Sequence, residues 1–141
     1  MALRDVITNL QSKAAALSGM KEAPTDPPES INQFPFALTY VQNGSWTPES
    51  AGFSHALISL VTEIHIARNV LPLDIQKALP FFEPFLRAIL NDLSLGSTVD
   101  TIGLIEFSFG GMTYGESGGI PVQTIGWKFT ISDVKITILG S

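Results

Sequence analysis

One segment of the sequence matches a nucleophile motif: Gly115-Glu116-Ser117-Gly118-Gly119 fits the G-x-S-x-G elbow of serine hydrolases. In those enzymes the serine lies between a strand and a helix, and a histidine later in the chain acts as the base. Here Ile120-Pro121-Val122 begins another predicted strand, and both histidines precede Ser117. Clusters of glycine and serine mark turns far more often than nucleophiles. We therefore interpret this segment as the tip of a hairpin.

A second group that could do chemistry lies on the strand predicted by the alternating pattern of residues 54–67. His55, Glu63 and His65 share one face of this strand, and Glu63 and His65 are immediate neighbours on it. They could form an acid–base pair or supply two metal ligands. His55 is roughly 33 Å from His65 along an extended strand, too far for one metal ion to bind both. The simpler interpretation is a polar or subunit-facing sheet surface.

The remaining candidates for chemistry are weaker. Four acidic residues fall in predicted loops, where nothing fixes their separation as a glycosidase requires: Asp26, Glu29, Glu49 and Glu116. They are solvated loop charges or, if repeated around a symmetric ring, an acidic rim or lumen. The glycine-rich segment lacks the lysine of a phosphate-binding loop, and the absence of cysteine excludes disulfides and thiolate zinc sites. We expect no catalytic residue, no metal and no cofactor.

Composition favours an assembly protein. The chain has 141 residues, enough for one domain, and only 15 % of them are charged, against about 25 % in an average soluble protein. The mean hydropathy is +0.27, and neither a secretory signal nor a membrane span is visible. Such a surface predicts burial against partner subunits. A net charge of −5 argues against specific nucleic-acid binding.

Hydrophobic periodicity, together with the positions of proline and glycine, predicts the secondary-structure elements that carry these residues. We expect an N-terminal helix over about 2–18, a proline-rich arm over about 19–34 and a sheet-and-helix body over about 35–141. In the body the pattern predicts strands at 36–41 and 54–67, separated by a loop in which Asn43-Gly44-Ser45 makes a turn.

A strongly apolar helical stretch from 71 to about 93 follows, interrupted at Pro80 and Pro84 as two short helices or one kinked helix. Two further strands are separated by a glycine-rich turn over 110–119. In the last strand the apolar phase flips at Ser132-Asp133, which predicts a bulge or bend there, or a strand end that crosses to another subunit. The expected fold is a single α+β domain of order α-β-β-α-β-β, with a mostly antiparallel sheet and helices packed on one face.

Candidate interface residues come from three places. Trp46 and Tyr114 lie at predicted loop tips, where exposed aromatic residues often anchor contacts, although packing on their own strands is the simpler interpretation. Pro27 and Pro28 belong to the arm, and His65 lies on the mixed face of its strand. A small-ligand site in the apolar space around Phe81, Phe82 and Phe85 is a further hypothesis, with core packing the simpler alternative.

Several runs resemble small proteins that tailed bacteriophages encode among their head–tail joining and tail genes. These runs are Ala23-Pro24-Thr25-Asp26-Pro27-Pro28-Glu29-Ser30-Ile31, Phe34-Pro35, and Glu63-Ile64-His65-Ile66-Ala67-Arg68 with Leu71-Pro72. In element order and length the chain is similar to tail terminator proteins of long-tailed phages and to related neck and tail-completion proteins.

This resemblance implies a virion structural protein of the tail or neck, assembled in the host bacterial cytoplasm. Such a protein forms a ring, typically a hexamer, that ends polymerisation at the head-proximal end of the tail tube. Its expected partners are itself, the tail tube protein and the head–tail connector protein, with genomic DNA only passing through the lumen and no membrane involved. The family has no catalytic residues to carry over. The alternatives are a head-completion or minor tail protein of the same neck region and, less favoured, a small hydrolase using Ser117.

Overall fold

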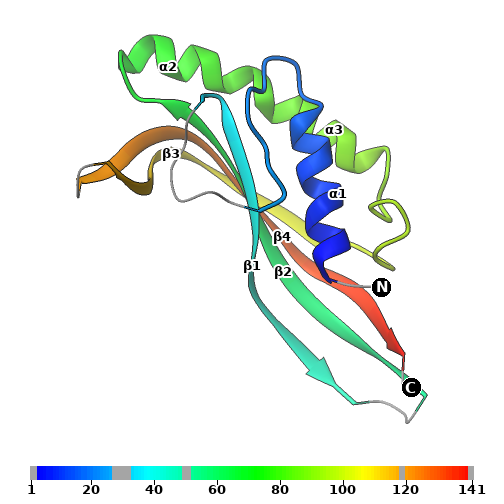
Figure 1. Ribbon diagram of the computed structural model, residues 1–141. Coiled ribbons are helices and arrows are strands. Elements are labelled where there is room, and N and C mark those ends of the chain that lie inside the picture. The colour runs from blue at the N-terminus through cyan, green and yellow to red at the C-terminus, as the bar shows by residue number, and fades with distance from the viewer. Residues whose placement is uncertain (1–2, 27–32, 49–51, 118–119, 140–141) are drawn as a thin grey trace.

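A four-stranded antiparallel sheet dominates the computed structural model, which describes residues 3–26, 33–48, 52–117 and 120–139 (Figure 1). The strand order is β1-β2-β4-β3, so β1 and β3 are the two edges. The strands are β1 (Phe36–Thr47), β2 (Phe53–Ala67), β3 (Leu104–Ser117) and β4 (Ile120–Leu139). The predicted α+β fold with one antiparallel sheet is confirmed.

The helices are α1 (Leu3–Ala15), α2 (Leu71–Ala78) and α3 (Phe82–Leu90), with a 3-10 turn, η1 (Leu79–Phe81), between α2 and α3. Pro80 lies in this turn, because proline cannot donate the hydrogen bond that would continue α2. Pro84 lies in the first turn of α3, where its missing N–H costs nothing. The predicted element order is therefore matched only in part, since two helices separate β2 from β3.

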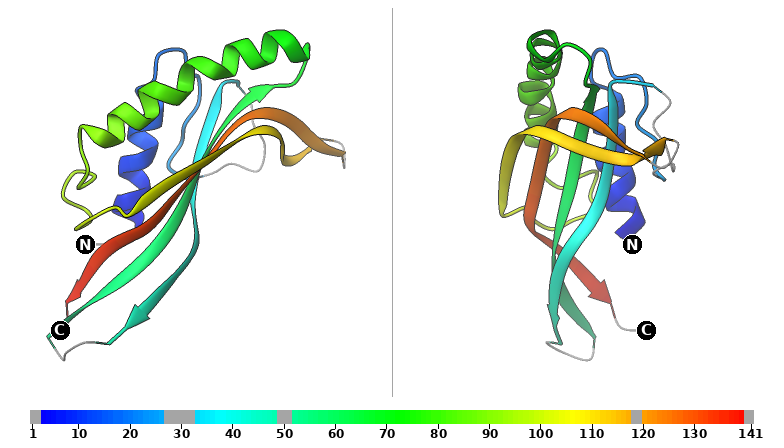
Figure 2. Two further views of the ribbon diagram at one scale, coloured as in Figure 1. Left: turned by 180° about the vertical axis from the view of Figure 1, so that it is seen from behind. Right: turned by 90° about the vertical axis from the view of Figure 1, so that its left-hand side faces the viewer.

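The core lies between the helices and the sheet. Figure 2 shows the helices on one side of the sheet, with the β1–β2 hairpin extending beyond them. Leu10 of α1 and Phe85 of α3 are fully buried, as are Ile64 of β2 and Phe129 of β4. The Trp127 indole is nearly buried as well, and its N–H donates a hydrogen bond to the Ala78 carbonyl at 2.8 Å. The helices thus cover only the upper part of the sheet.

The expected irregularity in the last strand is present as a bulge. Ile58 pairs with Val134, but Leu60 pairs with Ile131, so β4 contains one more residue than β2 over this interval. Asp133 adopts a left-handed backbone with φ of 53°. The extra residue returns the apolar side chains after the bulge to the core face, and Val134 is fully buried. The phase flip in the sequence therefore predicted a real feature.

One segment predicted as a turn and most of a second one are strands instead, and the end of the second, residues 118–119, lies outside the described residues. Asn43-Gly44-Ser45 lies within β1 and pairs with residues 57–59 of β2. Residues 110–117 of the glycine-rich segment continue β3 and pair with β4. The physical reason is that β2 and β4 are long enough to offer a backbone partner to these residues, and ladder hydrogen bonds outweigh a weak local turn preference.

Glycine lets β4 pass very close to its neighbour. A Cβ built on Gly126 would lie 1.8 Å from the Ile64 carbonyl oxygen of β2, so no other residue fits without moving the backbone. Directly opposite, Gly110 of β3 has open space around it. Beyond this point the β3–β4 hairpin curves away from the rest of the sheet (Figure 2). The curvature places Tyr114 against His65, with ring centroids 5.9 Å apart.

Candidate functional site

The acid–imidazole pair singled out in the sequence is part of a continuous polar network. His65 Nε2 lies 2.8 Å from Glu63 Oε1, and its Nδ1 lies 2.6 Å from Thr124 Oγ1. The Tyr40 hydroxyl donates to Glu63 Oε2 at 2.5 Å, and the Thr124 hydroxyl reaches the Met112 carbonyl at 3.3 Å. An ionised carboxylate only accepts hydrogen bonds, so Nε2 of the imidazole carries a proton. The network links all four strands.

Electrostatics in the network favour the ionised carboxylate. Burial by itself raises the pKa of Glu63, but hydrogen bonds from His65 and Tyr40 outweigh it, and the charges of His65 and Lys128 add to them. The pKa of Glu63 is therefore lower than its ordinary value. Burial and the hydrogen bond to Glu63 raise the pKa of the Tyr40 phenol far above its usual range. Both shifts favour an ionised Glu63 carboxylate and a neutral Tyr40 phenol.

The connectivity of carboxylate, imidazole and hydroxyl is that of a hydrolase triad. A nucleophile must nevertheless reach its substrate, and Thr124 and His65 are both fully buried. The rings of Phe36 and Tyr114 lie against the imidazole, with Phe36 at 6.3 Å between centroids. The arrangement therefore holds β1, β2 and the curved hairpin together. It also corrects one expectation, because a buried His65 side chain is not available to a partner subunit.

Other chemical groups are dispersed. Among the described residues, no cluster of three or more His, Asp or Glu side chains could hold a metal ion. The backbone of Ser117 lies in β3 and pairs with Ile120 at the start of β4. This is a strand–turn–strand context, whereas the nucleophile elbow needs a helix after the serine.

The predicted acidic rim is not assembled in one place. Asp26 forms a two-bond ion pair with Arg4, both bonds being 3.0 Å, so its charge is balanced. Glu116 lies in β3, where its backbone pairs with Pro121, and not in a loop as expected. Glu29 and Glu49 lie outside the described residues, as do the arm residues Pro27 and Pro28.

The two aromatic candidates lie in strands and differ in exposure. Trp46 is in β1, paired with Ala56, and 55 % of its surface is exposed. Its indole N–H donates to Ser54 Oγ at 2.6 Å, so the exposed ring has no unpaired donor. Tyr114 is in β3 and partly buried, because it packs on Phe36 with ring centroids 5.4 Å apart. Trp46 alone of the two presents a large aromatic surface.

An open apolar groove of about 410 Å³ runs between α3 and β3. Its apolar lining includes Phe82, Leu86, Leu90, Leu93 and Ile105. Phe81 and Phe85, by contrast, are core residues, so the hypothesis of a ligand space around the three phenylalanines is wrong for these two. The sequence carried a signal for this groove, since the helical stretch is more apolar than one buried face requires.

Beside the groove, the edge strand β3 prolongs the apolar surface. Phe107 is 54 % exposed and its ring meets Phe82 edge-on, with centroids 4.8 Å apart. Leu90, on the opposite wall, is 68 % exposed. Large apolar side chains in these positions are costly to leave in water and mark interaction surfaces when they are contiguous.

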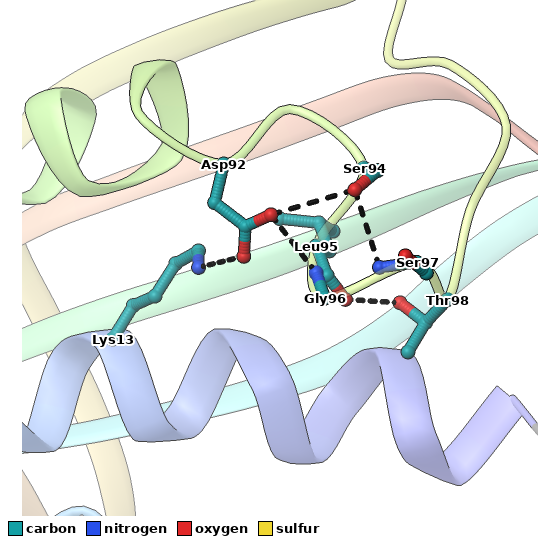
Figure 3. A network of polar contacts seen from close by, with 7 residues as sticks. All are labelled: Lys13, Asp92, Ser94, Leu95, Gly96, Ser97 and Thr98. Carbon is teal, nitrogen blue, oxygen red and sulfur yellow. Dashed lines mark hydrogen bonds and ion pairs between the residues drawn. The ribbon is translucent and has the colours of Figure 1, made fainter.

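A polar loop fixes the end of α3 and thereby the groove (Figure 3). Lys13 of α1 forms an ion pair with Asp92 at 2.7 Å, and the Gly96 N–H donates to the same carboxylate at 3.0 Å. These bonds lower the pKa of Asp92 below its usual value. In the same loop, the side chain of Leu95 is fully buried, and its backbone is left-handed with φ of 48°. The loop held by these bonds also carries Leu93, which lines the groove.

No protein-family model matches this chain, and a search of curated proteins found no significant match. Within the described ranges, no helix is long and apolar enough to cross a membrane. The candidate functional site is the apolar surface along the sheet edges, where Trp46 of β1 and Phe107 of β3 are exposed.

Proposed function

We propose that the chain is a structural subunit of a long-tailed bacteriophage virion. Copies of it form a ring, a hexamer, at the head-proximal end of the tail tube, where the ring ends tube polymerisation and joins the tail to the head connector. The observation that carries this proposal is the exposure of large apolar side chains at both edges of the sheet, Trp46 on β1 and Phe107 on β3. A chain with 15 % charged residues needs partners to cover such surfaces.

Size and charge support a ring around DNA. A compact domain of this length has a radius of gyration of about 14 Å, so a single copy cannot encircle a duplex, whereas a closed cyclic assembly can. The net charge of −5 suits a lumen through which DNA slides, because like charge prevents adhesion to phosphates. The resemblance of the sequence to tail terminator proteins, in its length and expected element order, supports this position in the virion.

A third apolar surface is available for a partner other than the chain itself. It lies on α2 and its flanks and consists of exposed Val70, Leu71, Leu73 and Leu79. This surface is separate in sequence from both sheet edges. We assign it to the tube or the connector, because a ring that joins two structures needs a face beyond its own subunit contacts.

The first test is the assembly state. Native mass spectrometry over a concentration series, followed by negative-stain imaging, should show a six-fold ring. The ring should then cap polymerising tail tube protein from the same phage and fix the tube length. A chain that stays monomeric at every concentration, and also beside the tube protein, would contradict the proposal.

Two alternatives are separated by further measurements. A head-completion or minor tail protein would bind the head connector or the tube wall without limiting tube length. A hydrolase using Ser117 would show turnover in an esterase panel that Ser117→Ala abolishes. A structural function predicts no esterase turnover in the native chain. It also predicts that Ser117→Ala assembles as the native chain does.

A further inference from the structure

We propose that β1 of one copy pairs with β3 of the next copy, and that Trp46 of the first enters the α3–β3 groove of the second. This inference rests on the proposed ring and names the surfaces that build it. The occupant of the groove is thus a second copy of this chain.

Strand direction permits this contact. The four strands alternate in direction along the order β1-β2-β4-β3, so the two edge strands run opposite to each other. When two copies have the same orientation, β1 of one therefore meets β3 of the next in antiparallel fashion. The contact joins two different surfaces, and a head-to-tail contact of this kind closes into a ring when the rotation per copy allows it.

The β1 edge is free where it leaves the core. Near its start the edge is covered by the arm, since Ala37 N–H donates to the Glu22 carbonyl at 2.9 Å. From Val41 to Thr47 every residue is exposed, and this stretch contains neither charge nor proline. Natural edge strands are usually protected by lysine, proline or a covering segment. An unprotected edge of seven residues is a template for pairing.

The β3 edge is similar. Residues 104–109 carry only one charge, Glu106, and within the described part of the chain this strand pairs with β4 alone. The apolar groove lies directly beside this edge, on the side of the sheet that carries the helices. A strand added to β3 would therefore place its helix-side residues over the groove.

Trp46 projects from the matching face. Gly44 pairs with the core residue Ile58, and Trp46 lies two positions further along β1, so both face the helix side. Phe107 pairs with the core residue Phe129 and faces the same side. Because the indole N–H is already bonded to Ser54, the ring can enter an apolar groove without leaving an unpaired donor. A buried aromatic anchor of this type typically dominates an interface.

Cross-linking of engineered cysteines tests the pairing directly, because the natural chain contains no cysteine. Ser45→Cys on β1 and Ser108→Cys on β3 place exposed thiols on the face opposite the helices. With a short bis-maleimide, the two single variants should cross-link only when mixed. The double variant should give a ladder of covalent oligomers that ends at the ring order.

The outcomes separate this inference from the proposed function. Efficient cross-linking of Ser108→Cys with itself, or of Ser45→Cys with itself, in an intact ring would overturn the edge pairing and leave the ring standing. A chain that remains monomeric in native mass spectrometry, with no cross-links, would overturn both.

The anchor has its own test. Trp46→Ser should weaken assembly roughly tenfold or more, as loss of a central aromatic anchor does, whereas Trp46→Phe should retain most of it. Ile120→Ser is the matched control, since Ile120 is 70 % exposed but lies at the hairpin tip. The fluorescence of buried Trp127 reports that each variant is folded. If Trp46→Ser assembled at the same concentration as the native chain, the groove would not be the binding site of Trp46.

Discussion

The network around His65 and the groove between α3 and β3 contrast in almost every respect. The first contains a carboxylate, an imidazole and hydroxyls, and those groups are paired with one another inside the protein. The second is lined mainly by aliphatic and aromatic side chains, among which Leu90 and Leu93 are exposed, with Glu83 and Arg87 beside them. Polar groups with complete partners stabilise a fold, whereas apolar groups without partners call for an assembly. The polar residues of the network thus bind one another within the fold, and the apolar residues of the groove are the functional candidates.

The free energy of unfolding of the monomer separates the two regions, and Gly126 beside His65 should have the largest effect. Gly126→Ala forces a Cβ to 1.8 Å from the Ile64 carbonyl oxygen. We expect a loss of more than about 4 kcal/mol or failure to fold, a size reserved for severe steric or burial defects. Gly110→Ala, directly opposite with open space around it, is the control for urea denaturation. Equal stability of the two variants would show that the strands are not this close.

Removal of the imidazole should come next. His65→Leu leaves the Glu63 carboxylate and the Thr124 hydroxyl without their shared hydrogen-bond partner, and leaving a buried charged group without such a partner costs about 3 kcal/mol or more. The second histidine provides the comparison, because His55 lies 3.9 Å from Asp100 near the surface. Such pairs are worth about 0–1 kcal/mol, so His55→Gln should unfold almost like the native chain. Similar losses in both variants would contradict a special role for the network.

Glu63→Gln tests the ionised carboxylate of the network through the pH dependence of stability. Loss of the charged acceptor should cost roughly 1–3 kcal/mol at pH 7. The pKa of Glu63 is lower in the folded state than its ordinary value of 4.5. The folded chain therefore binds fewer protons, and the stability from the carboxylate is present above pH 4.5 and lost as the pH falls through the folded pKa.

Thermal unfolding of Glu63→Gln and the native chain between pH 7 and pH 3 checks this expectation. The difference in stability should shrink as the pH falls below 4.5. A difference that stays constant over this range would mean that the carboxylate is not ionised in the folded protein.

The smallest effect on monomer stability should come from the groove. Leu90→Ser alters a side chain that is 68 % exposed, and we expect a change within about 0.5 kcal/mol. The same variant should nevertheless shift the assembly toward monomer in native mass spectrometry. Leu95→Ser, in the fully buried neighbour, should instead unfold the chain. If Leu90→Ser assembled normally, the groove would have no part in subunit contact.

The sequence predicted those parts of the fold in which buried and exposed residues alternate regularly along the chain. The even-numbered residues of 56–66 are buried as expected, because a strand with one core face must alternate. The bulge at Asp133 showed as a shift in that alternation. The turn expected at Asn43-Gly44-Ser45 was wrong, and the hairpin turn expected over 110–119 begins later, because β3 continues to Ser117 and the length of the partner strands decides where a hairpin ends.

Three properties follow from the sequence alone. Alternation of apolar residues predicted the strands, the positions of the prolines predicted the interrupted helices, and composition gave the low content of charged residues. These properties depend on residues close in sequence, and local sterics and solvation suffice for them. Whether Glu63 and His65 are buried, and whether Trp46 and Leu90 are exposed, depended on elements distant in sequence. The Tyr114 ring lies against His65 because the β3–β4 hairpin curves (Figure 2), and Leu90 lies beside β3, which is an edge of the sheet among the described residues. Burial is a property of the packed whole, and the same side chain becomes core or interface according to what lies across from it.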